Sequence, residues 1–255
     1  MHFKTIALVL AICTTLMELF PFSNAAVCKH CNTSNNECFV DTFGITYCNG
    51  VLVSYPEQLE LTKYYVDTRC CAIGEGAFSE NDFLQDVFIP DGVIVIGDNA
   101  FEGCSRLSTV HLPDSLLIIG SNAFTLCTLL EDIDLPLNLH SIGWQAFCDT
   151  WSLKEVAFPE TLRFVGDEAF AYSGVKEVFV HSMYIQCGYD VFTPDSLEAG
   201  DNLMLHFRED VFSEEIGDVS AWIEEIQQVD GITVIFDIPA NSSKEAWWIN
   251  PAFHH

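Results

Sequence analysis

The sequence predicts a repeat solenoid of about six or seven coils, closed at each end by a cap of different construction. Three observations support this fold class. A glycine-containing phrase recurs at a fixed spacing, apolar residues recur in columns between its copies, and the flanking segments lack the repeat. A repeat of 20–29 residues is typical of stacked coils, because one coil cannot bury its own apolar face.

The glycine phrase reads IGEGAF in its first copy and VGDEAF in its last. The five copies begin 23 residues apart, at 73–78, 96–101, 119–124, 142–147 and 165–170. Alanine and phenylalanine close each copy, and we expect them to fill the interior with alternating small and large groups. The glycine is expected to take either a backbone angle or a close approach that a Cβ would forbid.

A short extended segment is predicted in the middle of each repeat. Residues two apart, such as Val110 and Leu112, point to the same side of such a segment, and His111 between them points the other way. Pro113 then ends the strand, because proline lacks an amide donor and its φ is fixed. The apolar side of each strand should therefore join one continuous stacked core.

The repeated phrase L-x-x-V-x-L-P-x-x-x-x-x-I-G-x-x-A-F-x-x-C resembles the BspA-like class of leucine-rich repeats, known from bacterial and protist surface proteins. The match covers roughly residues 61–180. The resemblance implies a right-handed leucine-rich repeat β-solenoid, secretion, and a role in adhesion or extracellular recognition. It does not imply an enzyme.

The chain is predicted to contain five consecutive parts. They are a signal peptide at 1–25, a cysteine-rich N-terminal cap at 27–60, repeats at 61–212 with clear copies at 73–180, a C-terminal cap at 213–240 and a mobile tail at 241–255. The first part has a basic start at Lys4, an apolar run and small residues at 23–25, which favours a cleaved secretory signal. A retained membrane anchor is the less favoured alternative, because the apolar run is short and interrupted.

The C-terminal cap is expected to contain one helix and one strand. Apolar residues recur at three- and four-residue steps through 213–229, which predicts an amphipathic helix with Ser213 as its N-cap. Residues 232–238 read as a final strand. Before the cap, the register slips: Val178 lies eight residues after Phe170, where earlier coils have nine.

The charge of the chain excludes several partners. The net charge is −27, from 37 acidic and 10 basic residues. Nucleic acid and anionic lipid both require a basic surface, so neither is an expected partner, and we expect no membrane insertion after signal cleavage. An acidic surface favours cationic partners or weak binding of divalent cations, but it also serves solubility alone. The sequence contains no calcium-loop motif, and we expect no cofactor.

Ten cysteines remain after the signal peptide, and six of them precede the clear repeats. An even number in a secreted chain indicates disulfides. The candidates in the N-terminal cap are Cys28, Cys31, Cys38, Cys48, Cys70 and Cys71. A zinc site at Cys28-Lys29-His30-Cys31 is the minor alternative in an oxidising compartment. Cys104 and Cys127 should stack at strand spacing, and we favour two buried thiols over a bridge because their Cβ vectors should run parallel.

Two segments have the N-x-S/T pattern of a glycosylation acceptor, at Asn32 and Asn241. We expect both to lie in surface segments if the host glycosylates its secreted proteins.

Outward strand positions form the candidate recognition site, because the inward positions are committed to packing. Adjacent strands lie about 4.8 Å apart, so these positions should form a stripe of acidic and aromatic groups. One column is Lys63, Asp86, Thr109, Asp132, Glu155 and Glu177, and the other is Tyr65, Phe88, His111, Asp134, Ala157 and Phe179. Exposed Phe88 and Phe179 indicate a contact surface. The alternatives are that a loop or cap covers these rings, or that they have no role.

Three classes of function compete. A recognition module binding a protein or glycan on its strand face is favoured, and an acidic matrix or cation-gathering protein is the alternative. An enzyme is least favoured: His111 lies near Asp132 and Asp134, but no nucleophile, metal-protease or phosphate-binding motif accompanies them. We therefore assign no catalytic residue and no metal ligand.

Overall fold

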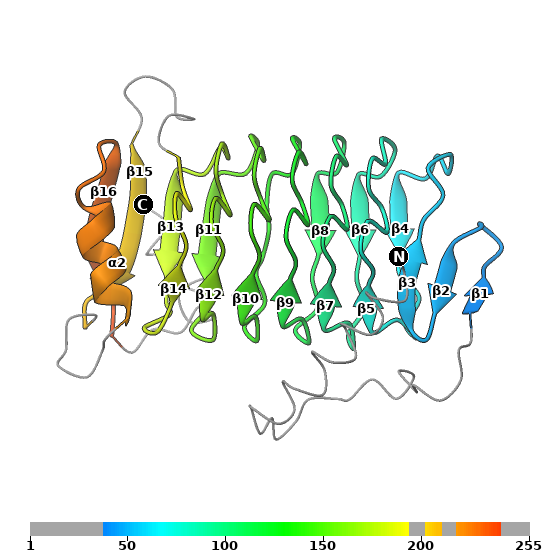
Figure 1. Ribbon diagram of the computed structural model, residues 1–255, viewed down its shortest axis with the longest axis horizontal. Helices are drawn as coiled ribbons and strands as arrows, with labels where there is room; N and C mark the ends of the chain where they lie inside the picture. Colours follow the sequence, from blue (N-terminus) through cyan, green and yellow to red (C-terminus); the bar gives the residue numbers. More distant parts are fainter. Residues whose placement is uncertain (1–37, 194–201, 211–217, 241–255) are drawn as a thin grey trace.

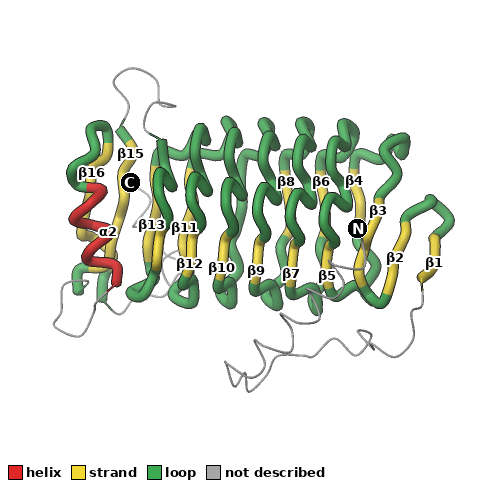
Figure 2. The backbone as a smooth tube through the Cα atoms, viewed as in Figure 1, coloured by secondary structure: helices red, strands yellow, loops and turns green. Residues whose placement is uncertain are grey.

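The computed structural model describes residues 38–193, 202–210 and 218–240. It shows an elongated solenoid in which the coils stack along the long axis, as Figure 1 shows. Each regular coil contributes a strand to one long row of strands, and most coils also contribute a second strand to the opposite row (Figure 2). The solenoid predicted from the repeat is confirmed.

The first row is a nine-stranded sheet in the order β1-β2-β3-β5-β7-β9-β10-β12-β14. The pairs β1–β2 and β2–β3 are antiparallel, and all later pairs are parallel. The strands are β1 Cys38–Val40, β2 Thr46–Cys48, β3 Val51–Ser54, β5 Ala72–Ile73, β7 Val95–Ile96, β9 Ile118–Ile119, β10 Ser141–Ile142, β12 Phe164–Val165 and β14 Gln186–Cys187. The two-residue strands come directly before the glycine of each coil.

The second row is divided into two sheets. A three-stranded sheet contains β4 Lys63–Tyr65, β6 Asp86–Phe88 and β8 Thr109–His111, all parallel. A four-stranded sheet contains β11 Glu155–Phe158, β13 Glu177–Val180, β15 Leu203–Arg208 and β16 Ile232–Ile238. Between the two sheets, the coil around Asp132 contributes only an isolated bridge to Thr109.

A row of phenylalanine rings forms the centre of the core. Phe78, Phe101, Phe124, Phe147 and Phe170 are each at most 1 % exposed. Successive rings in this row are stacked, with centroids 4.7–5.2 Å apart. Phe192 continues the row 5.4 Å beyond Phe170. The predicted single interior row is therefore present, and it joins the coils because each ring is covered by the next.

The repeated glycine is required by close approach of neighbouring coils. A Cβ on Gly143 would lie 2.5 Å from the amide nitrogen of Ser121, and one on Gly166 would lie 2.6 Å from that of Trp144. Neither glycine has a positive φ. Of the two explanations left open by the sequence, steric contact with the preceding coil is the correct one here.

Buried thiols occupy the turn after the phenylalanine in two coils. The Sγ of Cys104 donates to the carbonyl of Phe78, and that of Cys127 to the carbonyl of Phe101, each at 3.1 Å. Neither is in a disulfide, as favoured from the sequence. In the next coils Thr150 and Ser173 take the same position and donate to the carbonyls of Phe147 and Phe170. In these four coils the column thus supplies a donor to a buried carbonyl.

At the N-terminal end, β1 to β3 extend the nine-stranded sheet, and a disulfide joins Cys38 to Cys48. Cys71 is also disulfide-bonded. Cys70 differs from the prediction: it is a buried thiol, and its Sγ donates to the carbonyl of Ala72 at 3.0 Å. Among the other predicted features, the signal peptide, Cys28, Cys31, Asn32, Asn241, Ser213 and the tail lie outside the described residues.

The C-terminal end contains the predicted helix and strand. The helix α2 spans Asp218–Ile226, and β16 matches the predicted strand at 232–238. Trp222, Ile223 and Ile226 are buried in the main core, and α2 lies against β14. In the last coil a helix therefore takes the place that a strand of the nine-stranded sheet takes in earlier coils, so the core ends under α2 (Figure 1).

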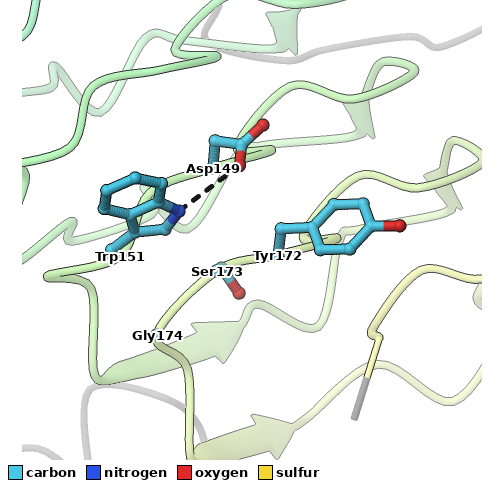
Figure 3. A pocket seen from close by; sticks show the side chains of 5 residues that line it. All are labelled: Asp149, Trp151, Tyr172, Ser173 and Gly174. Atoms are coloured by element: carbon cyan, nitrogen blue, oxygen red, sulfur yellow. Dashed lines mark hydrogen bonds between the residues drawn. The ribbon is translucent and has the colours of Figure 1, made fainter. Parts of the chain in front are cut away.

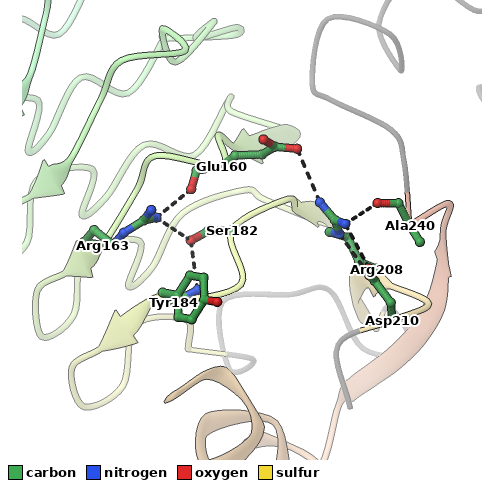
Figure 4. A network of polar contacts seen from close by, with 7 residues as sticks. All are labelled: Glu160, Arg163, Ser182, Tyr184, Arg208, Asp210 and Ala240. Atoms are coloured by element: carbon green, nitrogen blue, oxygen red, sulfur yellow. Dashed lines mark hydrogen bonds and ion pairs between the residues drawn. The ribbon is translucent and has the colours of Figure 1, made fainter. Parts of the chain in front are cut away.

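A polar network joins this end to the regular coils (Figure 4). Arg208 on β15 forms ion pairs with Glu160 at 3.3 Å and with Asp210 at 3.0 Å, and it donates to the carbonyl of Ala240. Arg163 donates to the carbonyl of Glu160 at 2.6 Å and lies over the ring of Tyr184. The charges of both arginines are thus used within the fold.

Candidate functional site

The outward residues of β4, β6 and β8 form one continuous surface, which we call the aromatic face. Pairing places Lys63 beside Asp86 and Asp86 beside Thr109. In the second column, Tyr65 lies beside Phe88 and Phe88 beside His111. The residues between the columns, Tyr64, Val87 and Val110, are buried in the core. Period-two alternation of the strand therefore directs both columns outward.

Stacked rings dominate the aromatic face. The ring of Phe88 lies 4.4 Å from that of Tyr65 and 4.0 Å from that of His111, with interplanar angles of 13° and 14°. Tyr65 is 64 % exposed, His111 is exposed and Phe88 is half-buried between them. The result is a ladder of three rings, one per strand, at the surface of a parallel sheet.

The basic side chain of Lys63 lies beside the ladder. The Nζ of Lys63 is 3.3 Å from Asp86 and 5.0 Å from the centroid of the Phe88 ring. Lys63 thus neutralises Asp86 and covers part of Phe88. Beyond β8, exposed Asp132 and Asp134 extend the face as an acidic margin. The face therefore combines apolar rings with carboxylates on one side.

The second half of the predicted stripe has a different environment. Phe179 is only 4 % exposed and forms a separate buried cluster with Ala157 and Ile238. His206 on β15 stacks on Phe179 at 4.6 Å, and its Nδ1 lies 3.0 Å from Asp237. The exposure predicted for Phe179 is wrong, because the C-terminal strands add side chains that cover it.

The two glutamates of the stripe lie beside this covered region. Glu155 and Glu177 are paired between β11 and β13, and both are half-buried. They share a column with the outward residues of the aromatic face but not its exposed rings. Of the nine predicted ligand-binding residues, the structure thus brings six together around the aromatic face: Asp86, Phe88, Thr109, His111, Asp132 and Asp134.

Within the described residues, no group of three or more histidine, cysteine, aspartate or glutamate side chains is arranged to hold a metal ion. The divalent-cation prediction gains no support from this part of the chain. In the same part, no helix is long and apolar enough to cross a bilayer.

Sequence reasoning missed a group of exposed aromatic residues in the turns. Trp151 and Tyr172 line a pocket of about 340 Å³ together with Asp149, Ser173 and Gly174 (Figure 3). Two signals in the sequence point there: Trp151 stands where earlier coils have a small or acidic polar residue, and the register slip begins at Gly174.

Comparison with known proteins agrees with the repeat pattern. Residues 57–198, more than half of the chain, match the family described as "BspA type Leucine rich repeat region", in six copies. No curated protein matches the chain.

Solved structures with similar folds are bacterial leucine-rich repeat proteins. A Treponema pallidum leucine-rich repeat protein is 19 % identical with a TM-score of 0.51, and the match covers 82 % of this chain and all of that one. A Bacteroides ovatus leucine-rich repeat protein is 24 % identical with a TM-score of 0.45, covering 69 % of this chain and 55 % of its own. The pneumococcal vaccine antigen PcpA is 15 % identical with a TM-score of 0.46, covering 83 % and 49 %. At 19 % identity the likeness to the Treponema pallidum protein concerns the fold alone.

Proposed function

Because the chain belongs to the BspA-type leucine-rich repeat family, we propose that it is a secreted recognition or adhesion protein that binds an extracellular protein or glycan on its aromatic face. The observation that carries this proposal is the stacked ladder of Tyr65, Phe88 and His111. Aromatic residues are enriched where protein surfaces bind partners. Because Phe88 is already held between the rings of Tyr65 and His111, its side chain loses little conformational entropy on binding.

Location outside the cell is supported by two features. The N-terminal residues have the pattern of a secretory signal, with a basic start, an apolar run and small residues before position 26. The Cys38–Cys48 disulfide also favours an oxidising compartment, because cytosolic thiols are kept reduced.

The alternative function is that of an acidic structural or cation-gathering component without a defined ligand. The net charge of −27 favours it, because such a surface attracts cations at any point of the molecule. The two functions make different demands on the aromatic face: a defined ligand requires the rings, and general charge attraction does not.

The test is binding of the purified mature chain to intact cells and to surfaces coated with extracellular matrix. Tyr65→Ser with Phe88→Ser removes two rings of the ladder without changing the net charge. Tyr189→Ser is the control, because Tyr189 is an exposed aromatic residue in a turn outside the aromatic face. The proposal expects the double variant to lose binding and the control to retain it, with circular dichroism verifying the fold of both.

Salt separates the two functions in the same assay. Exposed charge interactions are screened within about 3 Å at 1 M ionic strength, whereas apolar contacts between rings are retained. Binding that vanishes in high salt and is equal for the double variant and the unchanged chain would establish the acidic matrix function instead.

A further inference from the structure

A pocket opens in the turns between the coils of Phe147 and Phe170, away from the aromatic face. Its volume is about 340 Å³, and its lining comes from two successive turns: Asp149 and Trp151 from one, and Tyr172, Ser173 and Gly174 from the next. Figure 3 shows the indole of Trp151 and the ring of Tyr172 on either side, with the Asp149 carboxylate near the indole. The volume lies at the lower end of the range of ligand pockets.

The pocket exists because the second turn is one residue shorter than the others. Val156 follows Phe147 by nine residues, but Val178 follows Phe170 by eight. Gly174 occupies the shortened place, where a Cβ would lie only 2.0 Å from the carbonyl oxygen of Trp151. The chain therefore passes directly against the Trp151 backbone and has no side chain at this position.

Comparison with the earlier coils shows what is different here. The residue four after the phenylalanine is Asp82, Ser105 or Thr128 in those coils. These small polar groups are bonded to one another: Ser105 donates to Asp82 at 2.9 Å, and Thr128 donates to the carbonyl of Ser105. At the same position, Trp151 is followed by Gly174, so the indole has no side chain of the next coil at that position to pack against.

Both aromatic walls are open to solvent. Trp151 is 60 % exposed and Tyr172 is 52 % exposed. The backbone of the second turn is nevertheless fixed within the stack: the amide of Tyr172 donates to Thr193 Oγ1 at 2.7 Å, and the amide of Gly174 donates to the carbonyl of Thr150 at 3.0 Å. Large apolar rings held open on a rigid scaffold mark a binding site.

Asp149 supplies an acceptor at the edge of the pocket. Its Oδ1 accepts from the Trp151 indole nitrogen at 3.3 Å, and its Oδ2 accepts from the Cys148 thiol at 3.4 Å. Burial raises the pKa of Cys148 to about 12, and the adjacent Asp149 charge acts in the same direction, so the thiol remains a donor at neutral pH. Among the ion pairs between described residues, none includes Asp149. Asp149 therefore has no basic partner among these residues, and its carboxylate keeps acceptor capacity beyond the two hydrogen bonds that it accepts.

We propose that this pocket binds a neutral sugar residue of a glycan. A pyranose ring has an apolar face of C–H groups that fits against an aromatic ring and a rim of hydroxyl donors that fits a carboxylate, which is the combination offered by Trp151, Tyr172 and Asp149. Acidic sugars are disfavoured, because their carboxylates would meet Asp149 in a protein of net charge −27. The site lies on different residues from the aromatic face, so it does not depend on the proposed function above.

The experiment titrates the full mature chain with neutral oligosaccharides of glucose, galactose, mannose and N-acetylglucosamine, followed by ligand-observed NMR. Lactose and sialyllactose form a matched pair that differs in charge. We expect saturable binding of at least one neutral sugar, with Trp151→Ala weakening it by about tenfold. Trp144→Ala is the control, because Trp144 is also exposed but does not line the pocket. Asp149→Asn should weaken binding of the neutral sugar and reduce discrimination against sialyllactose.

Several results would overturn the inference. They are the absence of saturable binding by any neutral sugar, equal binding by Trp151→Ala, or equal affinity for lactose and sialyllactose. Tetramethylammonium is titrated in parallel, because two rings and a carboxylate also suit an organic cation. Binding of that cation, lost in Trp151→Ala and unaccompanied by sugar binding, would assign the pocket to cations instead. Loss of cell binding in the Tyr65/Phe88 double variant with sugar binding intact would separate this site from the aromatic face.

Discussion

Phe88 stacks on His111 across two parallel strands, with ring centroids 4.0 Å apart and an interplanar angle of 14°. Tyr65 stacks on the other side of Phe88 at 4.4 Å. The central ring is thus held by both neighbours, in contrast to a lone aromatic residue on a sheet, which can change rotamer freely. The orientation of the ladder is therefore set before any ligand binds.

The contact between Phe88 and His111 should be measurable as a coupling energy. We expect a double-mutant cycle of Phe88→Ala and His111→Ala to give about 0.5–1 kcal/mol in the free energy of unfolding, because cross-strand aromatic pairs stabilise sheets by this amount. Urea denaturation of the four proteins is the measurement. A cycle of Phe88→Ala with Phe164→Ala, in a different sheet, should be additive. Additivity in both cycles would show that the stack contributes nothing to stability.

Sequence reasoning succeeded for the interior because the repeat constrains it. A ring that recurs every 23 residues occupies the same place in each coil, so the stacking of Phe101 on Phe124 follows from spacing alone. The same argument gives the pairing of Asp86 with Thr109 and of Phe88 with His111. Periodicity within one chain thus determines the core and the register of the strands.

The exposure of outward residues could not be obtained in this way. Phe179 occupies the same column as Phe88, yet it is buried because His206 and Ile238 pack against it. Both of these residues belong to segments that lack the repeat, so the spacing could not predict this contact. The pocket beside Trp151 likewise depends on the turn at Gly174 being one residue shorter than in the earlier coils. The sequence shows the shorter turn but not how the backbone of that turn is placed against Trp151. The wrong exposure and the missed pocket both lie where the period breaks, and there the sequence offers no second copy for comparison.

Because neighbouring coils pack closely at the repeated glycines, we expect alanine to lower the free energy of unfolding more at one of these glycines than at a glycine in open space. Gly143→Ala should lower the free energy of unfolding by about 3 kcal/mol or more, because the new methyl would lie 2.5 Å from a backbone nitrogen of the preceding coil and the coils must separate. Gly76→Ala is the control: its φ is +61° but no atom lies within 4 Å, so only the left-handed backbone penalty of about 1–2 kcal/mol applies. Both values come from urea denaturation. Equal losses for the two variants would show that contact between coils is not what requires the glycine.

The buried thiols predict a loss of stability at alkaline pH. Burial raises the pKa of Cys104 from its ordinary value of 9.0 to about 12, and it raises the pKa of Cys127 well above 9.0. The unfolded chain therefore releases these protons at lower pH than the folded chain. The stability that this difference contributes is complete below about pH 9 and is lost above it. For Cys104 the loss runs from about pH 9 towards 12, at about 1.4 kcal/mol per pH unit, and Cys127 adds to it in the same direction.

The measurement is the free energy of unfolding by urea at about pH 7 and at about pH 10.5, midway through the pH window in which the Cys104 thiol titrates. Cys104→Ala with Cys127→Ala should be less stable at neutral pH, because it removes two buried groups and the hydrogen bonds to the carbonyls of Phe78 and Phe101. Its additional loss at alkaline pH should nevertheless be smaller than that of the unchanged chain, since the two titrating groups are absent. Other groups, such as Tyr55 with its pKa raised to about 12 by burial, titrate in both proteins and cancel in the comparison. An equal alkaline loss in the two proteins would contradict the assignment of the pH dependence to these thiols.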